Sequence, residues 1–158
     1  MWDTPEIIID DLVKRRPELK TCKQSIYDAY LILLDTVQKG NTIFTCGNGG
    51  SAADAEHIVG ELLKGFMKGR KLNKIDIETI EKYYPGEGEL ISKSLQKTIR
   101  SISLTSHIAL ITAFMNDVDP AFVFAQQLMG LGRINDTLLA ISTSGNSANV
   151  INACKIAR

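Results

Sequence analysis

Residues 42–66 read TIFTCGNGGSAADAEHIVGELLKGF, and this stretch contains the pattern on which the predicted fold depends. The apolar segment 42–46 predicts a short buried strand, and the glycine-rich segment 47–51 predicts a turn that opens a helix. Free backbone N–H groups and the positive end of a helix dipole favour an anionic or polyhydroxylated ligand at such a turn. We therefore expect a phosphate- or sugar-binding loop at this point of the chain.

The predicted helix after this loop carries His57 and Glu61 at a spacing of i, i+4, so both side chains share one face. A pair of this kind is more often a structural contact or a surface pair than a site. Apolar neighbours raise the pKa of a carboxylate, and this would make Glu61 a usable general base. The apolar residues around it in the sequence are Ile58, Val59, Leu62 and Leu63.

A second loop of the same type follows a second apolar run. Residues 137–141 (TLLAI) predict a buried strand, residues 142–147 (STSGNS) a hydroxyl-rich turn, and residues 148–158 a helix. Phosphate oxygens only accept hydrogen bonds, so donors gathered at a helix N-terminus suit them, although an ordinary capped turn has the same composition. The first loop, residues 47–51, contains neither the Walker A nor the GxGxxG pattern, so a small phosphorylated ligand is favoured over a nucleotide.

Three further segments complete the predicted core. Residues 17–39 have apolar residues at helical spacing between Pro17 and Gly40, which predicts one long helix. Its apolar stripe is wider than one sheet face needs, so we expect it to pack against another subunit. Residues 101–104 predict a strand, and helices are expected at 106–115 and 121–131.

Residues 67–100 differ from the rest because they are charged and lysine-rich. Two short helices are expected there, around 75–84 and 90–99, separated by Pro85-Gly86. The simpler interpretation is a solvated helical insert. The alternative is a cover over the site in which Tyr83 and Tyr84 flank a sugar.

Alternating strands and helices joined by short turns predict an α/β fold with a parallel sheet, and ligands in such sheets bind beyond the carboxyl ends of the strands. The 158 residues are enough for one domain, residues 1–158, with an N-terminal helical segment at 1–40. Three strands make a thin sheet, and the sequence stops inside an apparent helix. We therefore expect that C-terminal strands and a helix are missing.

Composition excludes several classes of partner. The net charge is zero and no basic stripe is present, so nucleic acid is not expected. No apolar run is long enough for a membrane span, and the acidic start does not resemble a signal peptide. The three cysteines form no CxxC pair, which argues against a disulfide framework or a thiolate zinc site and favours a reducing cytoplasm.

Taken together, CGNGGSAADAEHIVGELLKGF, NDVD and LLAISTSGNSANV resemble the sugar isomerase (SIS) domain, in particular the sedoheptulose 7-phosphate isomerase family. The resemblance extends from about residue 17 to the end and implies a three-layer, flavodoxin-like sheet flanked by helices. It also implies a homotetramer with sites at subunit interfaces. The implied reaction converts a ketose phosphate into an aldose phosphate through an enediol.

The resemblance also assigns roles to individual residues. Glu61 matches the catalytic glutamate, and His57 and Glu61 match two zinc ligands of metal-dependent members, so Zn²⁺ is the candidate cofactor. The family places a further glutamine and a metal-binding histidine in its final helices, before which this chain ends. The substrate contacts that the resemblance implies are Asn48, Gly49, Gly50, Ser51, Asp117, Ser142, Thr143, Ser144 and Ser147.

Two alternatives stay open on the sequence. One is a non-catalytic SIS protein that binds a phosphosugar as a sensor or binds a replication initiator. The presence of Glu61 and of the loop STSGNS favours the enzyme over this class. The other alternative is an isomerase for a different ketose phosphate, for which the insert at 67–100 is the natural place of change.

Overall fold

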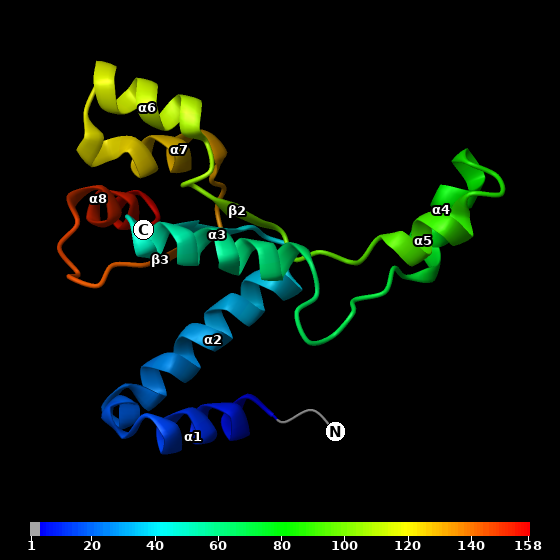
Figure 1. The fold of residues 1–158 in the computed structure, drawn as a ribbon, viewed down its shortest axis with the longest axis horizontal. Coiled ribbons are helices and arrows are strands. Elements are labelled where there is room, and N and C mark those ends of the chain that lie inside the picture. Colours follow the sequence, from blue (N-terminus) through cyan, green and yellow to red (C-terminus); the bar gives the residue numbers. More distant parts are fainter. Residues whose placement is uncertain (1–3) are drawn as a thin grey trace.

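The computed structural model describes residues 4–158, and its centre is a three-stranded parallel sheet (Figure 1). The strands are β1 (Ile43–Cys46), β2 (Ser101–Ser103) and β3 (Thr137–Ala140), in the order β2-β1-β3. Phe44 of β1 lies opposite Ile102 of β2 and Leu138 of β3. The parallel pairing confirms the α/β prediction and places the carboxyl ends of all three strands at one edge.

The helices alternate with these strands along the chain. They are α1 (Pro5–Arg15), α2 (Lys23–Gln38), α3 (Gly50–Leu63), α4 (Lys74–Tyr83), α5 (Gly88–Ser94), α6 (Ile108–Asp117), α7 (Val123–Leu131) and α8 (Ala148–Ile156), with 3-10 turns η1 (Pro17–Cys22) and η2 (Pro120–Phe122). Within the described part of the chain, no helix combines the length and the apolar character that crossing a lipid bilayer requires.

The single helix predicted for residues 17–39 is wrong in its first part. A 3-10 turn, η1, occupies that part, and the α-helix begins only at Lys23. Cys22 has φ −97° and ψ −1°, so its backbone departs from α-helical values between the two elements. Apolar residues three or four apart fit both kinds of helix over so short a stretch, and for this reason the spacing did not separate them.

The helix α1 precedes this turn and packs on α2. Arg16, the residue before Pro17, has φ −133° and ψ 76°, because a residue before proline avoids the α-helical region. The chain therefore reverses, and the Tyr27 hydroxyl of α2 donates to the Glu6 carboxylate of α1 at 2.8 Å. The first three residues of the predicted helical segment 1–40 lie outside the described residues.

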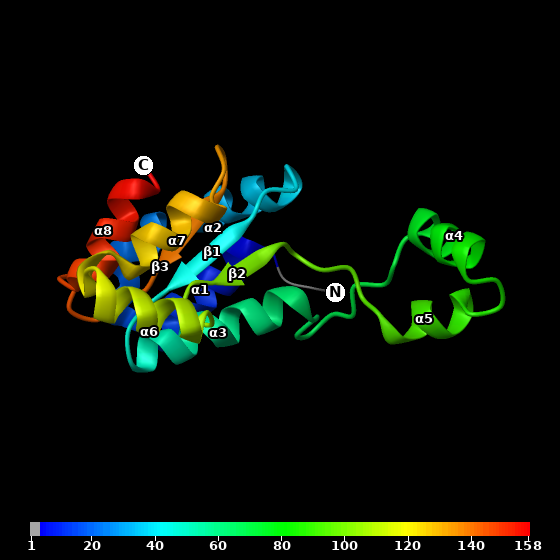
Figure 2. The ribbon, with the colours of Figure 1, turned by 90° about the horizontal axis from the view of Figure 1, so that it is seen from above.

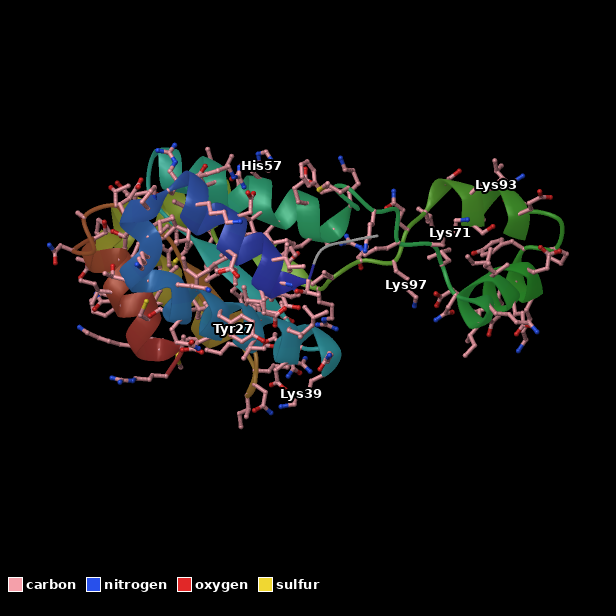
Figure 3. The ribbon with its side chains drawn as sticks, turned by 90° about the horizontal axis from the view of Figure 1, so that it is seen from below. Tyr27, Lys39, His57, Lys71, Lys93 and Lys97 are labelled. Atoms are coloured by element: carbon pink, nitrogen blue, oxygen red, sulfur yellow. The ribbon has the colours of Figure 1, made fainter. Side chains whose placement is uncertain are left out.

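The predicted insert, residues 67–100, forms an arm that extends away from the sheet (Figures 1 and 2). Its helices α4 and α5 pack on each other, and an Asn73–Asp76 capping box starts α4. The arm leaves from the end of α3 and returns directly into β2, so it stands at the edge opposite the carboxyl ends of the strands. Lys71 and Lys97 lie at the base of the arm, where it connects to the rest of the chain (Figure 3).

This geometry decides between the two interpretations of the insert within one chain. The turn that joins α4 to α5 lies at the far end of the arm, and Tyr83 and Tyr84 beside it are exposed. They do not flank the loops at the carboxyl edge of their own sheet. The alternative interpretation, in which these tyrosines cover the site, is therefore wrong within one chain. The arm is a solvated helical insert.

Helices cover both faces of the sheet. On one face, Phe44 and Cys46 of β1 form a core with α7 and α8. On the other face, the Thr45 hydroxyl donates to the Ala55 carbonyl of α3 at 3.0 Å. The core also contains Leu104, Val123, Phe124, Leu128, Val150 and Ala153.

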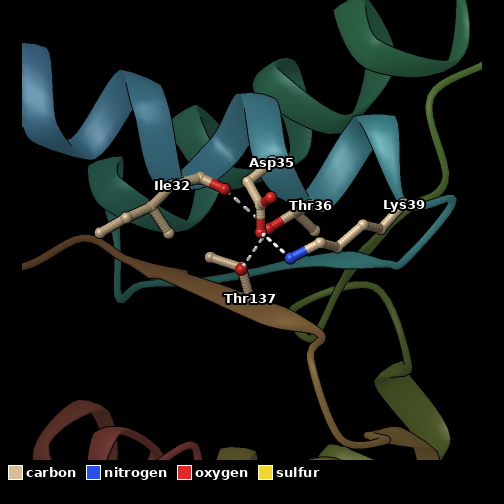
Figure 4. Close-up of polar contacts among 5 residues, drawn as sticks. All are labelled: Ile32, Asp35, Thr36, Lys39 and Thr137. Atoms are coloured by element: carbon tan, nitrogen blue, oxygen red, sulfur yellow. Dashed lines mark hydrogen bonds and ion pairs between the residues drawn. The ribbon is translucent and has the colours of Figure 1, made fainter.

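A polar contact fixes α2 against this second face (Figure 4). The hydroxyls of Thr36 in α2 and Thr137 in β3 lie 2.5 Å apart, and Thr36 also donates to the Ile32 carbonyl at 2.9 Å. Thr36 is buried, so both partners are needed to satisfy its hydroxyl. The result is a three-layer arrangement of helices, sheet and helices.

Candidate functional site

The two loops that the sequence singled out lie side by side at the carboxyl edge of the sheet. They follow β1 and β3, which are neighbours in the strand order. The side-chain amides of Asn48 and Asn149 join them, because each amide donates to the other's oxygen at 2.9 Å. Segments a hundred residues apart therefore meet where a parallel sheet binds its ligands.

The first loop has a backbone that only glycine accommodates. A Cβ on Gly47 would lie 2.5 Å from the carbonyl oxygen of Ser51. Gly49, which precedes α3, has φ +55°, in the left-handed region that favours glycine. Asn48, Gly49 and Gly50 are exposed and Ser51 is half-buried, so the loop faces outward at the N-terminus of α3.

The second loop is held in shape by its own hydroxyls. Ser142 Oγ accepts from the backbone N–H of Gly145 at 3.1 Å and lies 3.3 Å from Ser147 Oγ. Ser144 Oγ accepts from the backbone N–H of Asn146 at 3.2 Å. Thr143 is exposed, and Ser147 precedes α8 without a side-chain cap. The hydroxyls and the start of α8 thus form a preformed polar turn.

A pocket of about 210 Å³ opens between the first loop, the segment after β2, α6 and the starts of α7 and α8. Two of its polar lining residues, Thr105 and Asn149, were not predicted from the sequence. Thr105 follows the end of β2, and its hydroxyl donates to the Glu56 carboxylate of α3 at 3.0 Å. Its position directly after a predicted strand is the signal that could have identified it. The lining residues are Gly47, Asn48, Gly49, Ala52, Thr105, Ile111, Met115, Val123, Phe124 and Asn149.

Asp117, unlike residues of the first loop, does not line the pocket. It ends α6, and its carboxylate accepts from the side-chain amide of the adjacent Asn116 at 2.7 Å. It is not among the residues that line the pocket. The structure thus brings Asn48 and Gly49 to the pocket and keeps Asp117 two residues beyond Met115, which lines it.

A larger cavity of about 620 Å³ lies elsewhere, between α6 and α7 around His107. Its lining is mostly apolar, and His107 Nδ1 pairs with Gln127 Oε1 at 2.6 Å. Gln127 is buried and donates to the Leu104 carbonyl at 2.9 Å. His107 therefore has a structural role, and this cavity is a poor match for a phosphorylated ligand.

His57 and Glu61 lie one turn apart on α3, as the spacing predicted. His57 Nε2 is 3.7 Å from Glu61 Oε1, with His57 on the outer surface (Figure 3). The side chain of Glu61 is 29% exposed, and its second oxygen, Oε2, is buried without a hydrogen-bond partner. A buried carboxylate oxygen is costly unless a partner satisfies it, so this atom points to a missing contact.

Glu61 stands well along α3 from the loop that opens it. Ten residues separate it from Ser51, which corresponds to roughly 15 Å along the helix axis. Helical side chains tilt towards the N-terminus, so the carboxylate reaches back over part of this gap. A ligand that contacts both the loop and Glu61 must be extended, as an open-chain sugar phosphate is and inorganic phosphate is not.

The donor set fits one part of a zinc site. His57 and Glu61 are ordinary zinc ligands, and the partnerless Oε2 is a suitable donor atom. Within residues 4–158, however, no group of three or more His, Cys, Asp and Glu side chains is placed to hold a metal ion. The pair is therefore an incomplete ligand set by itself.

Cys46 ends β1 directly before the first loop but offers no nucleophile. It is fully buried, and burial raises the pKa of its thiol to about 12. The thiolate is the reactive form, so this side chain stays protonated and inert near neutral pH.

The sequence is similar to a known domain and to known enzymes. A model of the SIS domain matches residues 10–83. The phosphoheptose isomerase of Aliarcobacter butzleri is 35% identical over 140 residues, covering 89% of this chain and 60% of that protein. The phosphoheptose isomerase of Campylobacter jejuni is 36% identical over 141 residues, covering 89% of this chain and 62% of that protein.

Two solved structures of phosphoheptose isomerases superpose on this chain. The phosphoheptose isomerase of Neisseria gonorrhoeae superposes with a TM-score of 0.64 at 30% identity, covering 96% of this chain and 62% of that one. That of Francisella tularensis superposes with a TM-score of 0.66 at 25% identity, covering 98% of this chain and 70% of that one. The chain thus spans about three fifths of the length of the curated relatives it matches, with 60% and 62% covered.

Proposed function

We propose that the chain is a phosphosugar isomerase, on the premise of its SIS-type α/β fold and its sequence similarity to phosphoheptose isomerases. Its substrate would be sedoheptulose 7-phosphate and its product an aldoheptose 7-phosphate. One observation carries the proposal: two donor-rich loops meet at the start of the helix that also carries Glu61, whose Oε2 is buried without a partner. This arrangement suits a ligand with a phosphate at one end and a reacting carbon at the other.

The loops would hold the phosphate end. Backbone N–H groups and hydroxyls donate to phosphate without a cation, and the starts of α3 and α8 add the positive ends of two helix dipoles. Asn48 and Asp117 would contact sugar hydroxyls, with Asp117 drawn in by the substrate. The residues proposed for the phosphate end are Gly49, Gly50, Ser51, Ser142, Thr143, Ser144 and Ser147.

Glu61 would act as the general base. Its carboxylate removes a proton from C1 of the ketose, which gives the cis-enediol, and returns a proton to C2. The hydroxyl proton on O1 moves to O2 in the same conversion, so C1 becomes the aldehyde. The half-buried position of Glu61, on the helix that begins at the first loop, supports this role.

We also propose Zn²⁺ as a cofactor, held in part by His57 and Glu61. When bound, such an ion would polarise the carbonyl oxygen of the sugar as a Lewis acid. Because the described residues provide only two ligands, the proton transfers above are assigned to Glu61 alone.

We further propose that the protein works as a homotetramer. Apolar side chains of α1 and α2 are exposed in the single chain, with Ile8 and Ile32 more than half exposed. An exposed apolar face of this kind marks a contact surface, here with other copies. Light scattering coupled to gel filtration would return about four times the 17.4 kDa chain mass, and a monomer would contradict the assembly.

The test of the function is turnover of defined sugar phosphates. Sedoheptulose 7-phosphate and fructose 6-phosphate are incubated with the protein, with and without zinc, and aldose formation is followed by NMR. We expect conversion of the heptulose phosphate by the parent protein and by Glu78→Gln, an arm variant remote from the loops, and no conversion by Glu61→Gln. Binding without turnover would indicate a phosphosugar-binding protein, and preferred turnover of the hexulose phosphate would correct the substrate.

A further inference from the structure

The last turn of α3 contains Glu61, and its backbone needs partners from outside the helix. The final carbonyl groups of an α-helix find no N–H donor within the helix. The N–H of Lys64 donates to the Gly60 carbonyl at 2.9 Å, which leaves the carbonyls of Glu61 and Leu62. The stability of this turn therefore depends on what the arm provides.

Arg70 of the arm provides those partners. Its Nη2 donates to the Leu62 carbonyl at 2.6 Å and to the Glu61 carbonyl at 3.3 Å. Its Nε donates to the carbonyl of Lys97, in the segment that returns from the arm to β2, at 2.9 Å. A cation at a helix C-terminus interacts favourably with the dipole, and charge-assisted bonds are stronger than neutral ones. One guanidinium thus joins α3 to the outgoing and the returning segment at the base of the arm.

The surrounding contacts make this junction a built feature. The N–H of Lys97 donates to the Arg70 carbonyl at 2.6 Å, and the N–H of Ile99 donates to the Leu62 carbonyl at 2.9 Å. Gln96 Oε1 accepts from the N–H of Gly65 at 3.1 Å. Arg70 is half-buried among these groups. The neighbouring Lys71 is exposed at the base of the arm (Figure 3).

We propose that Arg70 is a positioning residue for Glu61. By capping the last turn of α3, Arg70 holds the Glu61 carboxylate at a fixed position relative to His57 and to the substrate. Lysine cannot replace it fully, because only the planar fork of arginine reaches three carbonyls at once. The catalytic part of this proposal rests on the function proposed above, whereas the capping of α3 does not.

The test compares Arg70→Gln and Arg70→Lys with Lys71→Gln, which removes a positive charge next to the cap and leaves its bonds in place. Three quantities are measured: kcat and KM for sedoheptulose 7-phosphate, hydrogen–deuterium exchange at amides 61–65, and the melting temperature. For Arg70→Gln we expect kcat to fall roughly tenfold or more, because small misplacements of a reacting group are costly. KM should stay within about twofold, since the phosphate loops are untouched.

Exchange at amides 61–65 should be faster in Arg70→Gln, partly restored in Arg70→Lys and unchanged in Lys71→Gln. An unchanged kcat, or unchanged exchange at these amides, would overturn the proposal. So would faster exchange throughout the chain with a general loss of melting temperature, since that indicates a global role. If the parent protein shows no turnover, the proposed function fails, and the exchange data still decide whether Arg70 holds the last turn of α3.

Discussion

At the scale of single residues, the loop after β1 depends on the absence of a side chain at one position. Gly47 has no room for a Cβ because the backbone of Ser51 occupies that space. This close approach lets the chain pass from strand to helix in a few residues. Gly60, in the middle of α3, has no such neighbour within 4 Å.

We expect Gly47→Ala to lower the free energy of unfolding by about 1–3 kcal/mol, because the added methyl forces the turn to move. Gly60→Ala is the matched control and should raise it by up to about 1 kcal/mol through better helix propensity. Urea unfolding followed by circular dichroism measures both. Equal effects of the two changes would contradict the packing described for the loop.

The cysteines provide a second prediction at this scale. Cys22 and Cys154 are exposed, whereas Cys46 is buried with a pKa of about 12. At pH 8 the exposed thiols should react readily with a disulfide reagent such as DTNB, and Cys46 should react only after unfolding in urea. Because burial raises the pKa of Cys46 to about 12, the thiol should stay protonated and unreactive when the pH is raised to 9. Fast reaction of a third thiol in the native protein would contradict its placement.

At the scale of elements, the strands were the most predictable parts. Phe44 and Leu138 lie in continuous apolar runs, as strands covered on both faces require. The 3-10 helix η1, which ends at Cys22, was not predictable, because only its backbone angles distinguish it from the α-helix that follows. Arg70 and Asn149 were also missed. A basic residue in a charged insert and an asparagine at a helix start have many ordinary roles, and only the fold brings them to their partners.

The contact between α2 and β3 tests the layer arrangement. Thr36→Val removes the hydroxyl that bonds to Thr137 and leaves the Thr137 hydroxyl without this partner. We expect a loss of about 1–2 kcal/mol in unfolding free energy, the usual range for a buried hydrogen bond. Thr79→Val in the arm is the control, since its hydroxyl bonds within an exposed helix and should change stability little. Identical stabilities of the two variants would place α2 differently from Figure 4.

At the scale of the whole molecule, the structure consists of a sheet with its covering helices and an arm attached at one junction. The arm's helices pack on each other and stand away from the sheet (Figure 2). Its base closes on itself, because the N–H of Lys97 donates to the Arg70 carbonyl. The distal part of the arm should therefore be removable without loss of the core.

Replacing residues 72–95 by a short glycine–serine turn should keep Arg70 and Gln96 in place and leave the cooperative unfolding of the core intact. We expect the melting temperature to change by only a few degrees, because the deleted helices bury little surface against the sheet. Calorimetry measures this directly. A non-cooperative transition would mean that the arm contributes to the core. If turnover in the shortened protein is lost while stability is retained, the arm acts on substrate rather than on folding.

The most direct test of the central claim follows the proton that Glu61 is proposed to move. Sedoheptulose 7-phosphate is incubated with the protein in D₂O, and the aldose is examined by NMR for deuterium at C2, beside Glu61→Gln. The account predicts deuterium at C2 with the parent protein and none with the variant, which should still bind the sugar phosphate through the two loops. Deuterium incorporation that survives in Glu61→Gln would contradict the assignment of Glu61 as the base.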